Sequence, residues 1–200
     1  MRKIVVSEFV TLDGVMQAPG GPDEDRRSGF EHGGWIRQYG DDVEGEVIRD
    51  GIAASGGFLL GRRTYEIFAA YWPFQPAANT FASMMNSLPK YVASTTLKGP
   101  LKWNNSILIR GDVTQEVTKI KQESGKELLV IGSGNLVQTL MKHELVDEYR
   151  LMVHPIVLGS GMRLFKEGSP KTALKLINNK TTTTGIMILT YQPEGKRNSQ

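Results

Sequence analysis

Short apolar runs that alternate with helical segments are the feature that most constrains how this chain folds. The run 128–131 is followed by a Gly-Ser-Gly turn at 132–134 and then by apolar residues at helical spacing. The same order recurs along the sequence, so strands are expected at residues 4–9, 58–60, 91–94, 107–109, 128–131 and 148–158. Helices are expected between them at residues 41–54, 63–71, 77–88, 113–124 and from 134 onward. Because strands separated by helices usually pair in parallel, the pattern predicts an α/β protein with a mostly parallel sheet.

The C-terminal part of the sequence predicts an antiparallel edge to that sheet. Residues 174–177 and 186–191 favour strands, and a turn is expected between them at 181–185. No linker or repeat divides the 200 residues, and 40% of them are apolar, so we expect a single domain over residues 1–200 with one core. Residues 192–200 are expected to form a flexible tail.

Composition and charge exclude several classes of function. The 24 Lys and Arg residues are scattered and nearly balanced by 21 Asp and Glu residues, which argues against a nucleic-acid partner. Cysteine is absent, so disulfides and thiolate metal sites are excluded, and no repeated His/Asp/Glu spacing suggests another metal site. Glu8 interrupts the N-terminal apolar stretch, and no run approaches the length of a membrane span. We therefore expect a cytoplasmic protein with no membrane partner.

Three turns lie at the carboxyl ends of predicted strands, at residues 60–64, 93–96 and 131–135. Ligands bind at this edge of an open α/β sheet, and two of the turns lead directly into helices, whose free N–H groups attract phosphate. The pattern predicts a phosphate cradle for a dinucleotide. Arg62 and Arg63, beside a hydroxyl-rich turn, suit the additional phosphate of NADPH better than the free hydroxyls of NADH. For each turn taken alone, a simple packing requirement is the favoured explanation. The segment GSGNLV at 132–137 also lacks the third glycine of a Rossmann fingerprint.

Several other residues have two open interpretations. Trp35, Phe68 and Trp72 either wall a pocket for a flat ring or pack in the core. Gly159 either contacts a ligand or forms a bend after a strand. His154 is interpreted as a buried sheet residue, with proton donation as the alternative.

Four segments carry a resemblance to a known family. They are the opening strand with Leu12-Asp13-Gly14, then LLGRRTYE, KYVAST and VIGSGNLVQTLMKHELVDEYRLMVHPIVLGSGMRLF. They resemble the dihydrofolate reductase-like superfamily and, within it, the C-terminal reductase domain of bifunctional riboflavin-biosynthesis deaminase-reductases, in order from about residue 2 to residue 192. The resemblance implies a three-layer fold with helices on both faces of the sheet. It also implies an NADPH-dependent oxidoreductase that forms a homodimer, and the strand after Asp147 is a candidate for the dimer contact.

The resemblance also implies roles for individual residues. The residues expected to bind NADPH are Asp13, Gly14, Gly61, Arg62, Arg63, Thr64, Ser94, Thr95, Gly132, Ser133, Gly134, Asn135 and Leu136. The residues expected to bind substrate are Trp35, Phe68, Trp72 and Gly159. Asp13 and Trp72 are the candidate catalytic residues.

The function expected from these observations is hydride transfer from NADPH to a small-molecule substrate. Because the chain lacks the cysteines of a zinc deaminase, it is expected to be a stand-alone reductase. The favoured substrate is a ribosylaminopyrimidine, as in riboflavin biosynthesis. The alternatives are a pterin or dihydrofolate-type reductase, a non-catalytic nucleotide-binding module of the same fold, and a flavin-binding protein.

Overall fold

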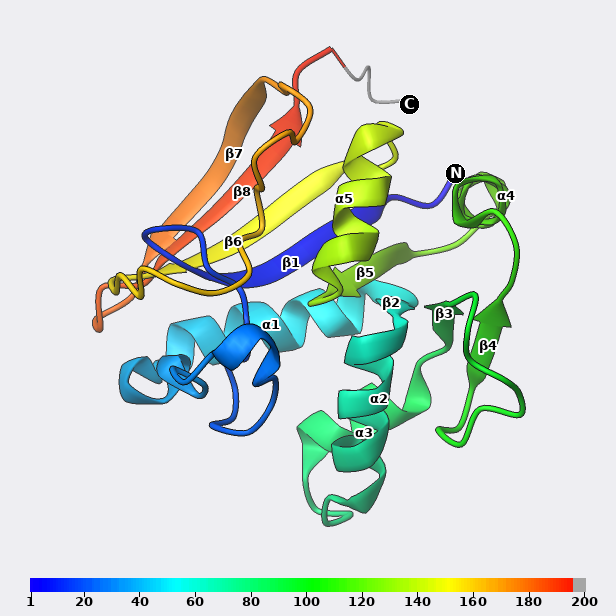
Figure 1. Cartoon of the computed structure of the whole chain (residues 1–200), viewed down its shortest axis with the longest axis horizontal. Helices are drawn as coiled ribbons and strands as arrows, with labels where there is room; N and C mark the ends of the chain where they lie inside the picture. Colours follow the sequence, from blue (N-terminus) through cyan, green and yellow to red (C-terminus); the bar gives the residue numbers. More distant parts are fainter. Residues whose placement is uncertain (196–200) are drawn as a thin grey trace.

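An eight-stranded sheet forms the centre of the protein (Figure 1), and the computed structural model describes residues 1–195. The strands run in the order β4-β3-β2-β5-β1-β6-β8-β7. Their bounds are β1 Ile4–Thr11, β2 Ser55–Gly61, β3 Lys90–Ala93, β4 Ser106–Ile109, β5 Glu127–Ile131, β6 Glu148–His154, β7 Leu174–Thr181 and β8 Met187–Pro193. The six strands β4, β3, β2, β5, β1 and β6 are parallel to one another, whereas β8 is antiparallel to both of its neighbours, β6 and β7. The predicted mostly parallel sheet with an antiparallel C-terminal edge is confirmed.

Helices cover both faces of the sheet. The α-helices are α1 Asp42–Ala54, α2 Arg62–Tyr71, α3 Thr80–Ser87, α4 Val113–Gln122 and α5 Gly134–Lys142, and short 3-10 turns lie at Arg27–Gly29, Trp35–Tyr39 and Trp72–Phe74. Because side chains alternate along a strand, Ile4 and Val6 pack with α4 and α5, whereas Val5 packs with α1, α2 and α3. The two core clusters on opposite sides of the sheet confirm the predicted three layers.

The chain leaves the neighbouring strands β2 and β5 in opposite directions along the sheet. From β2 the chain passes through α2 to β3 on one side, and from β5 it passes through α5 to β6 on the other. Helices α2 and α5 therefore begin near each other in the middle of the molecule (Figure 1). A crevice at the carboxyl ends of strands is expected at such a switch point, and it is the usual ligand site of an open α/β sheet.

The structure corrects some predicted boundaries. Strand β6 ends at His154 instead of residue 158, because Pro155 has no N–H to donate to a neighbouring strand. This strand lies inside the sheet between β1 and β8, so it is not the exposed strand that was expected for a dimer contact. The edge strands of the sheet in residues 1–195 are β4 and β7.

The expected tail begins later than residue 192. Gln192 and Pro193 still belong to β8, where they pair with Lys175 and Leu174. The rest of that prediction falls partly on residues 196–200, which lie outside the described part of the chain.

Within residues 1–195, no helix is long and apolar enough to cross a membrane. The same residues contain no group of three or more His, Asp or Glu side chains placed to hold a metal ion.

Candidate functional site

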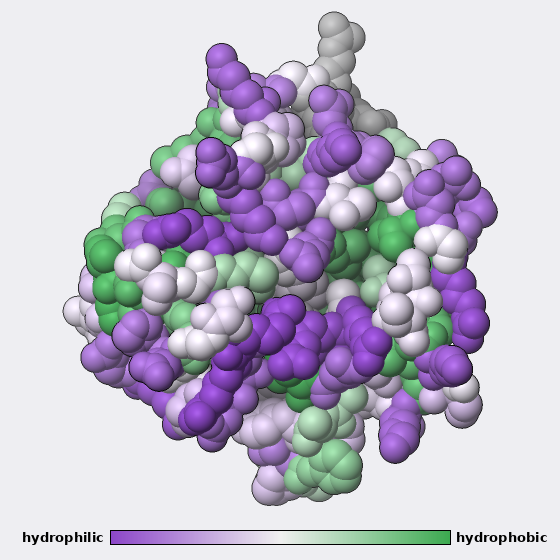
Figure 2. Space-filling model, viewed as in Figure 1, coloured by the Kyte–Doolittle hydropathy of each residue, from purple (hydrophilic) through white to green (hydrophobic). Residues whose placement is uncertain are grey.

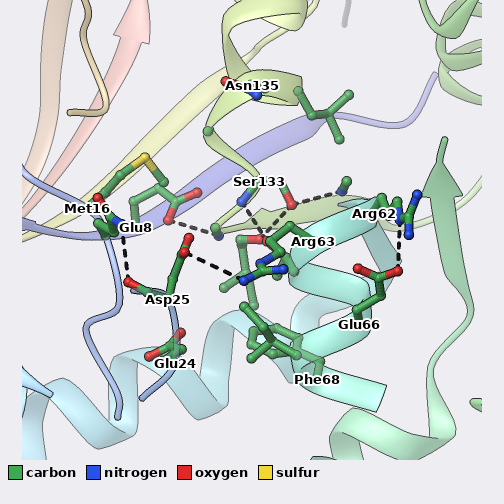
Figure 3. Close-up of a pocket in the computed structure, with 18 of the residues that line it drawn as sticks. Glu8, Met16, Glu24, Asp25, Arg62, Arg63, Glu66, Phe68, Ser133 and Asn135 are labelled. Atoms are coloured by element: carbon green, nitrogen blue, oxygen red, sulfur yellow. Dashed lines mark hydrogen bonds and ion pairs between the residues drawn. The ribbon is translucent and has the colours of Figure 1, made fainter. Parts of the chain in front are cut away.

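A cavity of about 860 Å³ opens at the switch point. Its walls come from the ends of β1, β2, β3 and β5, from α2, from the start of α5 and from the loop after β1 (Figure 3). This volume falls in the range of cofactor and small-molecule sites. Hydrophilic side chains gather around the middle of the face shown in Figure 2, where α2 and α5 begin.

The N-termini of the two helices at the cavity differ from those of the other helices. Helices α1, α3 and α4 each begin with a side chain that accepts a hydrogen bond from a first-turn N–H, namely Asp41, Asn79 and Asp112. Helices α2 and α5 are preceded by Gly61 and Ser133, and neither residue supplies such a side-chain cap. Their first-turn N–H groups belong to residues 62–64 and 134–136, all of which line the cavity. Two uncapped helix N-termini on one cavity favour an anionic ligand, because helix dipoles and free N–H groups both attract negative charge.

The turn before α5 is joined to the turn before α2 by hydrogen bonds. The Ser133 N–H donates to Thr64 Oγ1 at 2.8 Å, and the Gly61 N–H donates to Ser133 Oγ at 2.9 Å. Gly132 has a φ of +60°, and a Cβ there would lie 2.8 Å from Thr64 Oγ1. The hydroxyls of Thr64 and Ser133, predicted to contact cofactor, are therefore used to hold the two helix starts together.

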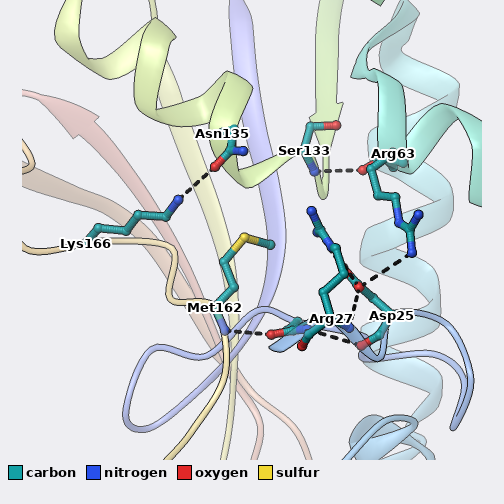
Figure 4. Close-up of polar contacts among 9 residues, drawn as sticks. Asp25, Arg27, Arg63, Ser133, Asn135, Met162 and Lys166 are labelled. Carbon is teal, nitrogen blue, oxygen red and sulfur yellow. Dashed lines mark hydrogen bonds and ion pairs between the residues drawn. The ribbon is translucent and has the colours of Figure 1, made fainter. Parts of the chain in front are cut away.

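Arg62 and Arg63 both line the cavity but extend in different directions (Figure 3). Arg62 Nη1 donates to Thr96 Oγ1 at 2.7 Å, and its Nε donates to Glu66 at 2.8 Å. Arg63 Nη2 lies 3.8 Å from Asp25 Oδ1 in the loop after β1 (Figure 4). The structure therefore separates two residues that the sequence grouped at a single phosphate.

The turn after β3 also borders the cavity. Ser94 Oγ accepts hydrogen bonds from the N–H groups of Thr96 and Leu97, so this hydroxyl stabilises its own turn. Thr95 is exposed and lines the cavity beside it. The hydroxyls left to face a ligand here are those of Thr95 and Thr96, the latter already bonded to Arg62.

Two aromatic residues predicted to bind substrate lie in the cavity wall. Phe68 and Trp72 pack edge to face with ring centroids 6.3 Å apart. The indole N–H of Trp72 is buried and has no hydrogen-bond partner among residues 1–195. A buried donor without a partner is costly, so this N–H is suited to a carbonyl or ring nitrogen of a bound molecule.

Asp13, Gly14 and Gly159 lie together and are not among the residues that line the cavity, so their predicted contacts with cofactor and substrate stay predictions. Asp13 accepts hydrogen bonds from the N–H groups of Leu158 and Gly159, at 3.2 and 2.9 Å. Burial raises the pKa of Asp13, but hydrogen bonds from Thr11 and from these backbone groups outweigh it and bring the pKa to about 2. Asp13 is therefore an ionised residue that joins two loops, and it is not a proton donor to the cavity.

Trp35 is likewise a structural residue, which corrects its predicted place at the substrate. It is 5% exposed, and its indole N–H donates to the Gln17 carbonyl at 2.8 Å. Its ring packs against the ring of His154, with centroids 5.2 Å apart. Of the two interpretations left open for Trp35, the structure shows packing in the core.

The loop after β1 is held by contacts that the sequence does not indicate. Gln17 donates to the carbonyls of Asp25 and Arg27, and its Oε1 accepts from the Met162 N–H at 2.9 Å (Figure 4). The Asp25 carboxylate is 6% exposed, and Arg27 donates to both of its oxygens. Burial raises the pKa of Asp25, but the hydrogen bonds and positive charge of Arg27 outweigh it, so the net shift is downward. Nearby, Lys166 donates to Asn135 Oδ1 at 2.8 Å and occupies that side chain.

Glu8 is another cavity residue that the sequence did not identify as functional. It is 4% exposed, and its Oε2 accepts from the Gly132 N–H at 2.9 Å (Figure 3). Burial raises the pKa of Glu8 well above 4.5, and the hydrogen bond from Gly132 opposes that shift only in part. A charged residue type inside an otherwise apolar strand was the available signal.

The cavity thus combines two uncapped helix N-termini, an apolar aromatic wall and buried carboxyl groups. The model of the RibD C-terminal domain family matches residues 2–188. An uncharacterised Bacillus subtilis (strain 168) protein, YyaP, is 28% identical over 97% of this chain and 96% of its own length.

Solved structures share the fold. A protein of Shewanella sp. PV-4 provisionally assigned to riboflavin biosynthesis matches with a TM-score of 0.67 and 19% identity, over 96% of this chain and 99% of that one. A Thermotoga maritima diaminohydroxyphosphoribosylaminopyrimidine deaminase/5-amino-6-(5-phosphoribosylamino)uracil reductase matches with a TM-score of 0.63 and 13% identity. That match covers 96% of this chain and 56% of the Thermotoga chain.

Proposed function

The chain belongs to the RibD C-terminal domain family, and on that premise we propose that it is an NADPH-dependent reductase of a small heterocyclic substrate. The favoured substrate class is a ribosylaminopyrimidine, as in riboflavin biosynthesis. The observation that carries the proposal is the pair of uncapped helix N-termini, α2 and α5, on one cavity at the switch point of the sheet.

The residues of the cavity fit a dinucleotide with an additional phosphate. The N–H groups at the starts of α2 and α5 would hold the pyrophosphate, and Gly132 and Gly134 allow a close approach of the backbone. Arg62, together with Thr95 and Thr96, forms the polar corner that would hold a ribose phosphate. When bound, the reduced nicotinamide supplies the hydride.

The other side of the cavity fits a flat ring. Phe68 and Trp72 provide an apolar wall, and the unpaired indole N–H provides a donor for a ring carbonyl. Arg27 and Asp25 stand opposite in the loop after β1, held by Gln17, so they would position the polar substituents of a substrate. The pterin-type alternative uses the same kind of ring, and a substrate screen with both classes separates them.

Calorimetric titration with NADPH and NADH tests the proposal in the wild type and in two variants. Arg62, but not Arg63, contacts the turn after β3. Arg62→Ala should therefore weaken NADPH binding by about tenfold to a hundredfold, the range for a lost charge-assisted hydrogen bond. The same variant should change the Kd for NADH by less than about twofold. Arg63→Ala should weaken both nucleotides alike.

Arg26→Ala is the matched control. It removes the same charge from a side chain that is 69% exposed and outside the cavity lining, so both affinities should be unchanged. Equal weakening of NADPH and NADH by Arg62→Ala would contradict the phosphate assignment, and wild-type protein that binds neither nucleotide would contradict the reductase. The expected homodimer and cytoplasmic location stay predictions.

A further inference from the structure

Glu8 occupies an unusual position in the central strand β1. Val6 and Val10, two residues away on either side, pack in the core cluster that α5 completes, so Glu8 faces the same side of the sheet. Its partner in the neighbouring strand β6 is Leu151. Gly132, at the end of β5, binds one carboxyl oxygen, and the other oxygen, Oε1, is buried with no hydrogen-bond partner among residues 1–195.

The charges around Glu8 do not neutralise it. The ionisable groups that share its cavity are Glu24, Asp25, Arg27, Arg62, Arg63 and Glu66. The neighbouring strands add Glu148, Tyr149, Arg150 and His154 on β6 and Glu127 on β5. None of the ion pairs found among residues 1–195, with N and O within 4 Å, includes Glu8. The part of α5 above it, Gly134 to Met141, has no ionisable side chain. Ionising a buried carboxyl group with no cation nearby costs free energy. The neutral acid avoids that cost, and its Oε2 still accepts the hydrogen bond from Gly132.

Resting on the proposed function, we propose that Glu8 holds one proton at the wall of the cavity and supplies it to the substrate when the cofactor is oxidised. The raised pKa of Glu8, which follows from its burial, supports a neutral acid in the resting protein. The geometry carries the argument: a carboxyl group in the cavity wall, fixed by one backbone N–H, with its second oxygen unpaired.

The reaction balances with this single proton. Reduction of a C=N or C=O bond adds a hydride, with its two electrons, to carbon and a proton to nitrogen or oxygen. The hydride comes from the reduced nicotinamide, which is oxidised and gains a positive charge. The Glu8 carboxyl group gives up its O–H proton, which forms the new N–H or O–H bond of the product, and the remaining carboxylate keeps its hydrogen bond from Gly132. A proton from water restores the acid after the product leaves.

Charge linkage makes this role measurable without a substrate. The nicotinamide ring is neutral in NADPH and positively charged in NADP⁺, so only NADP⁺ favours ionised Glu8 through a low-dielectric cavity. Binding of NADP⁺ should therefore release a proton, whereas binding of NADPH should not. The additional phosphate titrates alike in both nucleotides, so its effect cancels in the ratio of the two dissociation constants.

The experiment measures Kd for NADP⁺ and NADPH between about pH 6 and pH 9. In the wild type, the ratio Kd(NADP⁺)/Kd(NADPH) should fall with rising pH, by up to about tenfold per pH unit. Glu8→Gln keeps an acceptor for the Gly132 N–H but has no proton to lose, so its ratio should be constant.

Glu44→Gln is the matched control, because burial raises the pKa of Glu44 to about 7 but this residue does not line the cavity. Its ratio should fall as steeply as that of the wild type. A constant ratio in the wild type, or a falling ratio in Glu8→Gln, with both nucleotides bound, would overturn the role of Glu8 and leave the reductase intact. Absence of binding of both nucleotides would overturn the reductase and the role of Glu8 together.

Discussion

Glu44→Gln should change how the stability of the protein depends on pH. Glu44, in the first turn of α1, is 7% exposed, and its Oε1 lies 3.3 Å from Nε2 of His154, which is fully buried. His154 Nδ1 lies 3.0 Å from the Met152 carbonyl and donates to it, which leaves the Nε2 lone pair toward Glu44. Burial raises the pKa of Glu44 to about 7, with the nearby Asp41 as a lesser cause, and burial lowers the pKa of His154. Below about pH 7 the Glu44 carboxyl is therefore mostly protonated, and burial favours the neutral form of His154 beside it.

The size and sign of the effect follow from the two pKa values of Glu44. The unfolded chain loses the Glu44 proton above about pH 4.5, whereas the folded protein keeps it until about pH 7. Between those values the unfolded state binds fewer protons than the folded state, so this group makes the free energy of unfolding fall as pH rises. The full decrease amounts to about 3 kcal/mol. His154 has the opposite sign, because its lowered pKa costs stability as pH falls below its ordinary value, but both proteins retain it.

Urea unfolding of the wild type and Glu44→Gln at several pH values measures the difference. Glutamine has nearly the same size as glutamate but does not titrate, so the variant removes the titration and keeps the packing against His154. Relative to the variant, the wild type should lose about 3 kcal/mol between pH 4.5 and pH 7. Parallel curves would show that Glu44 does not hold a proton in the folded protein. A difference of opposite sign would show an ion pair between carboxylate and imidazolium.

Two further substitutions test the turns and the buried cation. Gly132→Ala should lower stability by at least about 2 kcal/mol in urea unfolding, because a left-handed backbone and a Cβ 2.8 Å from Thr64 Oγ1 both oppose it. Gly111→Ala, with a φ of +83° but open space around it, is the control and should cost only the backbone part. Lys90 is fully buried over Trp103, and burial lowers its pKa to about 8. Between pH 8 and 10.5 the unfolded state binds more protons than the folded state, so the free energy of unfolding of the wild type should rise by up to about 3 kcal/mol relative to that of Lys90→Met. No rise would contradict the lowered pKa of Lys90.

Local patterns in the sequence predicted the mostly parallel sheet and the position of the cavity, and the family resemblance added the three layers. The apolar runs that became β1, β2 and β5 are buried on both faces, and the turns that follow β2 and β5 lie where the sheet topology places ligands. These features depend on residues within a few positions of each other, which is why composition and spacing indicate them. Strand β7 extends to Thr181 beyond its predicted end, because pairing with β8 continues over polar residues that have no hydrophobic pattern.

Contacts between distant parts of the chain could not be predicted in this way. Gln17 reaches Met162, and Asp13 reaches Gly159, across about three quarters of the sequence. Because neither pair has a local pattern, the sequence alone did not show that Asp13 joins two loops. Glu8 was overlooked for a related reason, since its significance depends on the Gly132 N–H and on a cavity that forms only when β1 and β5 pair.

The turns GRRT (61–64) and GSG (132–134) are joined by hydrogen bonds. The sequence suggested that the hydroxyls of Thr64 and Ser133 contact a ligand, yet these hydroxyls bind the backbone of the opposite turn. These hydrogen bonds fix the start of α2 relative to the start of α5. The residues that carry the first-turn N–H groups of both helices line the cavity. Recognition of an anion at this site thus depends on backbone direction more than on the hydroxyl side chains. A substitution that keeps a hydroxyl at position 64 should therefore preserve binding, whereas any side chain at position 132 would disturb both helix starts at once.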